Sequence, residues 1–274
     1  MKNPHFIKQI KKVSQIEKDD EEVLMTQIRV RAHLLDKELQ VFGSRKTVLS
    51  EQKLNDLVRR LEIYRKHFDL QKPDFKWAGE VEKIYRSALY QPESYRYSWL
   101  PNVQLRIDEE EFYKLMTTRR SIRKFTHRII DDRLLEKVLT FATWAPTNCN
   151  QQSLRFVVVR TKEIREKIVH GGMNGRMSPC IVAVVSDLRF YSAGDIECPA
   201  HDSGAAIQNM LLAIHYYGLG ACYTSSASCN SQKIRTLLGV KTYEKITALI
   251  WVGYHEHSPM PTVRRNVAEI IRHL

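Results

Sequence analysis

The sequence lacks the features that mark secreted, membrane-spanning or metal-binding proteins. Its five cysteines are scattered over 274 residues, and no two of them have C-x-x-C spacing. Cys198 and His201 are three residues apart, but no second pair of ligands follows them, so we expect reduced thiols and no metal site. The strongest apolar run, residues 181–185, has the length of a strand and is too short to cross a bilayer. No apolar signal region follows the charge at the N-terminus, so we expect a cytoplasmic protein without membrane contact.

Acidic residues are scarce as well. The chain has 31 Asp and Glu against 43 Lys and Arg, which gives a formal net charge of +12. The excess is uneven, because residues 1–110 carry a net +3 and residues 111–274 a net +9. A basic second part suits phosphorylated cofactors and anionic substrates, and it also suits nucleic acid.

The first part of the chain is predicted to be helical. Apolar residues recur at helical spacing between residues 23 and 39, Ser50 can cap a second helix, and Asp74 can start a third. A tyrosine-rich connector between Pro92 and Pro101 follows these helices. We therefore expect two domains: a helical N-terminal extension over residues 1–105 and a second domain over residues 106–274.

In the second part, predicted helices and strands alternate. Asp108 can start one helix, and Asp131 or Asp132 can cap the next. A long apolar helix is predicted over residues 202–217, capped by Asp202 and buried in a core or in a subunit interface. Strand patterns cover residues 156–159, 181–185, 221–224 and 246–252. Because neither hairpin turn signals nor repeats accompany these elements, we expect a layered α+β or α/β domain.

A dense basic segment lies where the helix that Asp108 starts comes to its end. Arg119, Arg120 and Arg123 offer rigid forks of donors that match phosphate oxygens, and Ser121 adds a compact hydroxyl. Taken alone, the segment also fits an ordinary solvated surface, as most basic clusters do. Both interpretations are open at this point.

Three further segments accompany the basic one. They are residues 145–153 (APTNCNQQS), residues 202–209 (DSGAAIQN) running into 218–222 (GLGAC), and residues 251–254 (WVGY) followed by Arg264 and Arg265. In this order and at these separations the four segments resemble the FMN-dependent nitroreductase family, from about residue 112 to the end.

The resemblance implies an α+β fold with a nitroreductase-like central mixed sheet flanked by helices, here with an α-helical N-terminal extension. It also implies an obligate homodimer that binds FMN at its interface, so that each flavin site draws on both chains. The electron donor of the family is NADH or NADPH, which reduces FMN and leaves before a second substrate takes the electrons, in a ping-pong reaction.

By position in the family's motifs, the predicted flavin-binding residues form four groups. The phosphate and ribityl chain are held by Arg119, Arg120, Ser121 and Arg123, and the phosphate is closed from the C-terminal side by Arg264 and Arg265. The isoalloxazine ring meets residues of the partner subunit, namely Pro146, Thr147, Asn148, Asn150 and Gln152. A backbone N–H near flavin N5 is expected at Thr224, Ser225 or Ser226. Because the flavin carries the chemistry, no catalytic side chain is predicted.

The predicted function is reduction of a nitroaromatic, a quinone or a related small acceptor. The same fold serves other flavin reactions, such as dehalogenation, dehydrogenation of thiazolines or peptides, and flavin fragmentation, and the sequence does not separate them. A third interpretation, based on the net charge of +12 and the helical extension, is a non-catalytic basic module that binds nucleic acid or a protein partner. No stacking-aromatic or recognition-helix pattern supports nucleic acid as the partner.

Overall fold

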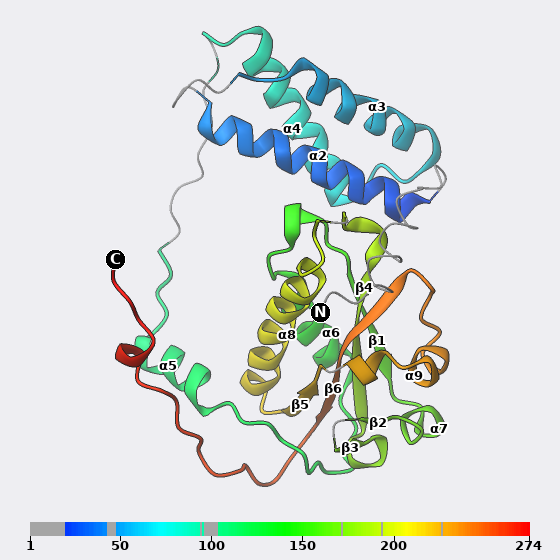
Figure 1. The fold of residues 1–274 in the computed structure, drawn as a ribbon, viewed down its shortest axis with the longest axis vertical. Helices are drawn as coiled ribbons and strands as arrows, with labels where there is room; N and C mark the ends of the chain where they lie inside the picture. Colours follow the sequence, from blue (N-terminus) through cyan, green and yellow to red (C-terminus); the bar gives the residue numbers. More distant parts are fainter. Residues whose placement is uncertain are drawn as a thin grey trace.

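The computed structural model describes residues 20–42, 48–93, 95, 104–170, 172–192, 194–225 and 227–274. Figure 1 shows two parts: three helices at the top, drawn in blue and cyan, and a sheet with its own helices below them. Most of the tyrosine-rich connector predicted between Pro92 and Pro101 lies outside the described residues.

The three upper helices pack around a core of their own. They are α2 (Glu21–Val41), α3 (Glu51–His67) and α4 (Pro73–Tyr90), and their apolar faces form one cluster that includes Ile28 and Leu57. Each helix has one apolar face, and packing the three helices together encloses these faces in a common core. We call these helices the N-terminal unit.

Local sequence signals set the ends of these helices. Ser50 caps α3 as predicted, because its hydroxyl accepts a hydrogen bond from the N–H of Lys53 at 3.3 Å. Helix α4 begins at Pro73, with Asp74 in its first turn, one residue earlier than expected. Proline suits this position since it has no N–H to leave unsatisfied.

A four-stranded sheet forms the centre of the lower part. Neighbouring strands pair antiparallel, and a single parallel bridge between Ser121 and Ala221 adds the mixed character at one edge. From edge to edge the strands are β1 (Leu154–Val159), β4 (Cys180–Asp187), β6 (Glu244–Gly253) and β5 (Gly220–Thr224). A separate two-stranded ribbon pairs β2 (Val169–His170) with β3 (Met173–Asn174).

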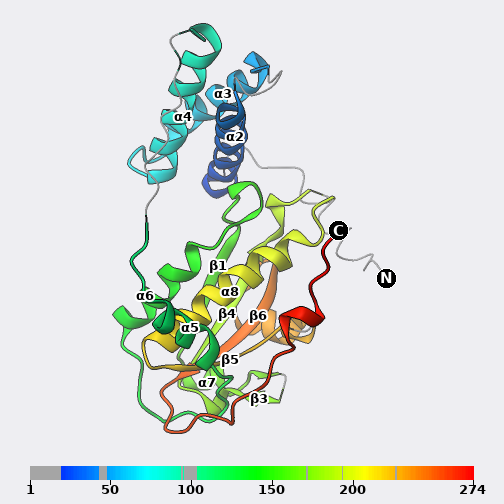
Figure 2. The same cartoon turned by 90° about the vertical axis from the view of Figure 1, so that its left-hand side faces the viewer.

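One face of the sheet is covered by two helices, α6 (Asp132–Thr143) and α8 (Cys198–Tyr216). Figure 2 shows both helices in front of the strands. Val182 and Ile250 point to this side and pack with Met210 of α8. Because side chains alternate along a strand, their neighbours point to the opposite face.

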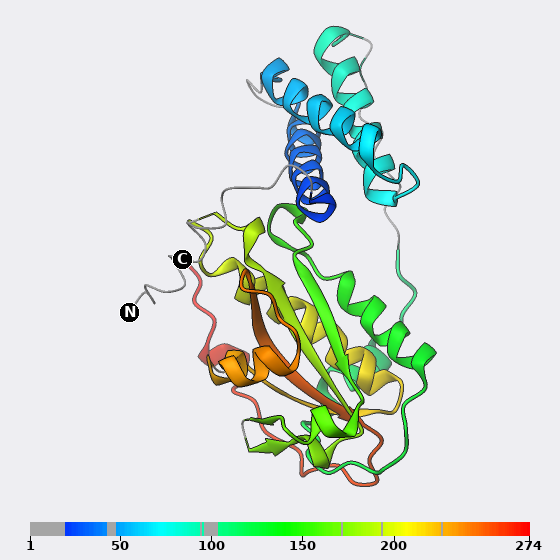
Figure 3. The same ribbon diagram turned by 90° about the vertical axis from the view of Figure 1, so that its right-hand side faces the viewer.

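The opposite face carries a second core. Ile181 of β4 and Trp251 of β6 are fully buried there, with Ile234 of α9 (Gln232–Leu237) in the same cluster. Figure 3 shows α9 and the β2–β3 ribbon on this side, together with α7 (Lys162–Arg165). Helices on both faces of a mostly antiparallel sheet confirm the predicted α+β class.

Helix α8 begins four residues earlier than the sequence predicts. Its first residue is Cys198 and Pro199 lies in its first turn, so Asp202 lies inside the helix. The prediction that Asp202 caps α8 is therefore wrong. Its carboxylate is buried and serves a neighbouring loop instead of the helix end.

Candidate functional site

The basic segment follows helix α5 (Glu109–Thr118), which Asp108 caps by accepting from the N–H of Glu111 at 2.9 Å. The guanidinium of Arg120 turns back and donates from Nη1 to the carbonyls of Thr117 (2.6 Å) and Arg119 (2.9 Å). Carbonyls at a helix C-terminus carry partial negative charge, so they orient the cation. Both bonds use Nη1, which leaves Nη2 and Nε of the guanidinium available to a ligand.

Ser121 and Ile122 fasten this segment to the edge of the sheet. Ser121 forms the parallel bridge with Ala221, and the N–H of Ile122 donates to the Ala221 carbonyl at 2.9 Å. Gly220 permits this approach, because a Cβ at that position would lie 2.6 Å from Cγ1 of Ile122. The arginines on either side are thereby held beside β5.

The charged residues of the segment affect a titratable residue of the strand. Burial raises the pKa of the Cys222 thiol in β5, while the nearby Arg123 and Arg119 lower it. Arg123 is exposed, and its Nη1 donates to the Ser121 carbonyl at 3.4 Å. Arg119 and Arg123 therefore flank Ser121 and Ile122, the two residues that attach the segment to β5.

A small hollow with a cavity volume of about 20 Å³ opens between this segment and the C-terminal end of α8. Arg119, Arg120, His215 and His255 line it, and Oγ1 of Thr118 lies 2.8 Å from Nε2 of His215. Burial lowers the pKa of His215, and the positive charges of Arg119 and Arg120 lower it further. The lowered pKa favours the neutral form of His215, and the guanidiniums that lower it give the hollow a positive charge.

The end of β5 holds the next group of predicted residues. Thr224 is the last residue of the strand to which the basic segment is fastened. Its Oγ1 is buried without a hydrogen-bond partner in the described part of the chain. Ser225 is exposed beside it, and Ser226 lies outside the described residues.

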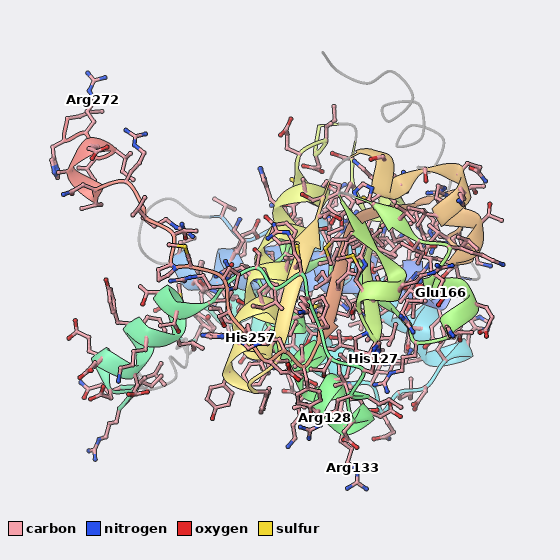
Figure 4. The ribbon with its side chains drawn as sticks, turned by 90° about the horizontal axis from the view of Figure 1, so that it is seen from below. His127, Arg128, Arg133, Glu166, His257 and Arg272 are labelled. Atoms are coloured by element: carbon pink, nitrogen blue, oxygen red, sulfur yellow. The ribbon has the colours of Figure 1, made fainter. Side chains whose placement is uncertain are left out.

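The C-terminal pair Arg264 and Arg265 lies on an extended, exposed tail. Arg264 donates to Oγ1 of Thr262 at 2.8 Å, and Arg265 pairs with Glu269 at 3.3 Å, so these bonds stay within the tail. Figure 4, seen from below, shows Arg272 of this tail far from the sheet, on the side of α5. One chain alone does not bring the pair onto the basic segment.

The predicted ring-contacting loop, residues 146–152, forms a tight turn ahead of β1. Cys149, Asn150 and Gln152 have φ angles of 47°, 53° and 53°, which place them in the left-handed region. Inside the loop, Gln152 makes two hydrogen bonds of 3.1 Å. Its backbone N–H donates to Oγ1 of Thr147, and its side-chain Nε2 donates to Oδ1 of Asn150. Backbone strain of this kind persists only where the surroundings enforce it. Pro146, at the start of the loop, is exposed.

Asp202 provides part of that enforcement from within α8. Its Oδ1 accepts the N–H of Asn148 at 2.9 Å, and its Oδ2 accepts the hydroxyl of Tyr191 at 2.8 Å. The Tyr191 hydroxyl also hydrogen-bonds the hydroxyl of Ser153, where the loop joins β1. Burial raises the pKa of Asp202, and the hydrogen bonds from Tyr191 and Asn148 lower it in part. No local pattern in the sequence connects Asp202 with this loop.

The two halves of the predicted site lie at opposite ends of α8. The loop is attached at Asp202, and the basic hollow is lined by His215, thirteen residues later in the same helix. At a rise of 1.5 Å per residue these positions are about 20 Å apart. One chain thus gathers Arg119, Arg120, Ser121, Arg123 and Thr224 at one edge and keeps the loop away from them.

Several apolar side chains on α5 and on the C-terminal tail are exposed. Helix α5 buries none of its residues, and Phe112 and Tyr113 are 53% and 67% exposed. On the tail, Val263 and Ile270 are 93% and 60% exposed.

The described residues lack two kinds of feature. They contain no group of three His, Cys, Asp or Glu side chains arranged to hold a metal ion. Among the helices described, none combines the length and the apolar character needed to pass through a bilayer.

The second part of the chain is similar to known proteins. The sequence profile of the nitroreductase family matches residues 116–170 and 174–254. A protein of Archaeoglobus fulgidus, provisionally named NADH dehydrogenase/NAD(P)H nitroreductase, is 31% identical over 150 residues, which cover 53% of this chain and 86% of that protein. The chain therefore belongs to the nitroreductase family, and the prediction from its four segments is confirmed.

A solved structure and a mammalian enzyme extend the comparison. A provisionally named nitroreductase of Desulfovibrio desulfuricans, solved in complex with FMN, matches with a TM-score of 0.54 and 26% identity, over 61% of this chain and 98% of that chain. Iodotyrosine deiodinase 1 of Mus musculus is 22% identical over 205 residues, 62% of this chain and 72% of that protein. The family profile begins at residue 116, after the N-terminal unit.

Proposed function

We propose that this chain is an FMN-dependent oxidoreductase that uses NADH or NADPH to reduce a nitroaromatic, a quinone or a related small acceptor by a ping-pong mechanism. The observation that carries the proposal is the basic segment held beside β5 by the Ser121–Ala221 bridge, with Arg119 and Arg120 lining one hollow there. Membership of the nitroreductase family and the FMN complex of the Desulfovibrio desulfuricans protein support FMN as the ligand.

The residues at this edge fit a phosphorylated ligand. A phosphate dianion needs charge-assisted donors, and Arg119, Arg120 and Arg123 supply them beside the Ser121 hydroxyl. In this proposal Arg264 and Arg265 close on the phosphate from the tail. Neutral His215 adds a donor or acceptor without adding charge.

The residues of the loop fit the flavin ring. Asn148, Asn150 and Gln152 carry amide donors and acceptors for the edge of the ring, and Pro146 and Thr147 shape their approach. A backbone N–H near Thr224, Ser225 or Ser226 would donate to flavin N5. When bound, FMN supplies hydride acceptance from NAD(P)H and electron delivery to the acceptor, while these residues bind and orient it.

The proposal includes a homodimer with shared flavin sites. The loop and the basic segment of one chain are about 20 Å apart along α8, so they serve one flavin only if two chains supply one each. A two-fold axis would create two such sites and would cover the apolar side chains of α5 and the tail in both chains. Residues 106–274 then form the FMN-binding domain and residues 1–105 the helical extension.

Turnover with defined acceptors tests the function. FMN-loaded protein is reduced anaerobically with NADH or NADPH and then mixed with a nitroaromatic or a quinone, and the products are identified. We expect reoxidation of the flavin and a stoichiometric amount of reduced product. Loaded protein that neither nicotinamide reduces would contradict the proposal.

Reductive dehalogenation is a second candidate, favoured by the similarity to iodotyrosine deiodinase 1 of Mus musculus. The same reduced protein is offered an iodinated tyrosine, and released iodide is measured. Iodide release without reduction of nitroaromatics or quinones would replace the first candidate by this one. Reduction of these acceptors with no iodide released would eliminate it.

A further inference from the structure

The N-terminal unit rests on the loop that the proposed function places against the flavin ring. Helix α2 packs on the short 3-10 helix η1 (Asn148–Asn150) of that loop and on η3 (Leu188–Phe190), which follows β4. Figures 1 and 3 show the lower end of α2 directly above these turns. The family profile accounts for the loop but begins after the unit.

One arginine joins the unit to the loop. Nη1 of Arg29 donates to the Gln151 carbonyl at 3.2 Å and to Oγ1 of Thr26 at 3.1 Å, while Nη2 pairs with Asp74 at 3.2 Å. The side chain of Arg29 is only 14% exposed. A single guanidinium therefore connects α2, α4 and the loop in a place where water competes poorly for its bonds.

The loop needs such support because of its conformation. Gln151 lies between Asn150 and Gln152, both of which have φ near 53°, and it is 5% exposed. Asp202 holds the start of the turn from α8, and Arg29 holds its end from α2. Two supports on opposite sides are what an otherwise unfavourable turn requires.

The contact is more than ordinary packing. Nε of Arg29 and Oε1 of Gln151 are buried without hydrogen-bond partners in the described part of the chain. Burying unpaired polar atoms is unfavourable, so the contact between Arg29 and Gln151 is not optimised for stability alone.

The unit has a second, separate attachment to the lower part. Arg189 bonds Asp20 at the start of α2, pairs with Asp187 at 2.6 Å, and stacks on the ring of Tyr243 at 3.9 Å. These contacts do not involve Arg29, so we expect them to keep α2 docked on η3 when the Arg29 contact is removed. The role of Arg29 at the loop is therefore separable from the docking of the unit.

We infer that Arg29 is a positioning residue for the flavin-binding loop, through which the N-terminal unit fixes the arrangement that Asn148, Asn150 and Gln152 present to the partner's flavin. The inference rests on the proposed function. The N-terminal unit then contributes to the flavin site indirectly, because none of the unit's residues is assigned to contact the cofactor.

The test compares Arg29→Ala and Arg29→Lys with Arg31→Ala as the matched control. Arg31 lies two residues away on α2 but pairs with Asp56 of α3 at 2.7 Å and does not face the loop. Two quantities are measured: hydrogen exchange of amides 147–153 in the cofactor-free protein, and the dissociation constant of FMN from quenching of its fluorescence.

We expect Arg29→Ala to accelerate exchange in the loop and to weaken FMN binding by about tenfold or more, as expected for a lost charge-assisted hydrogen bond. Arg29→Lys, which keeps one cationic donor, should recover part of both, and Arg31→Ala should behave as wild type. If Arg29→Ala disturbs folding, Asp74→Asn, which loosens the guanidinium and keeps its donors, must shift both quantities in the same direction.

Folded Arg29→Ala protein with wild-type loop exchange and wild-type FMN affinity would overturn the inference. So would an equal loss of FMN affinity in Arg31→Ala, because the effect would then belong to the whole helix. Wild-type protein that binds no FMN would overturn the proposed function and the inference with it.

Discussion

Asp202 is the buried group whose removal has the clearest expected consequence. Replacing it with alanine leaves the N–H of Asn148 and the hydroxyl of Tyr191 without their buried acceptor. An unsatisfied buried donor costs about 1–3 kcal/mol. The Tyr191 hydroxyl keeps its contact with Ser153, so the expected loss for Asp202→Ala is near the lower end of the sum, about 2–4 kcal/mol.

The free energy of unfolding of this variant is measured from urea titrations at pH 7, beside Asp132→Ala as a control. Asp132 is an exposed carboxylate on α6, 82% exposed, that pairs with Arg160, so its removal should cost less than about 1 kcal/mol. We also expect faster hydrogen exchange at Asn148 in Asp202→Ala. A loss no greater than that of the control, with unchanged exchange, would refute the assignment of Asp202 as the brace of this loop.

The remaining predictions concern pH, packing, the cofactor and assembly. Burial raises the folded-state pKa of Asp202, so the folded protein favours the protonated carboxyl. The free energy of unfolding of the wild type should therefore fall, relative to that of Asp202→Asn, as pH rises from about 4, the unfolded pKa, through the folded pKa. Parallel urea titrations of the two proteins across pH would show this difference. Gly220→Ala should cost about 1–3 kcal/mol in the free energy of unfolding, since its Cβ would overlap the basic segment; an unchanged value would contradict the close approach. Arg119→Ala and Arg120→Ala should each weaken FMN binding by about tenfold to a hundredfold in fluorescence titrations; wild-type affinity in both would refute the phosphate assignment. Phe112→Glu should shift the protein toward monomer in sedimentation, whereas a dimer as tight as wild type would place the interface elsewhere.

Local chemistry explains which parts of the fold could be predicted from sequence. Ser50, Asp108 and Asp131 each satisfy N–H groups two or three residues away, so their capping is visible in the residues themselves. The strands also follow from short apolar runs, and the family follows from four segments in order. The same local rule failed at Asp202, because its carboxylate accepts a hydrogen bond from Asn148, in a loop distant in sequence, and does not cap a helix.

The parts that escaped prediction depend on contacts between distant residues. Arg29 and Gln151 are separated by 122 positions, and no local pattern marks either one. His215 and His255 join the hollow only because α8 and the segment after β6 meet at the edge of β5. A buried cation in the N-terminal unit and two histidines near an arginine pair become informative only once the chain is folded.

The central claim is that this chain binds FMN and passes electrons through it. The most direct measurement is the visible absorption spectrum of the purified protein, reconstituted with FMN if needed, before and after anaerobic addition of NADH or NADPH. We expect one FMN per chain, a flavin spectrum, and bleaching of that spectrum by a nicotinamide. A protein that stays colourless after reconstitution and retains no FMN would contradict it.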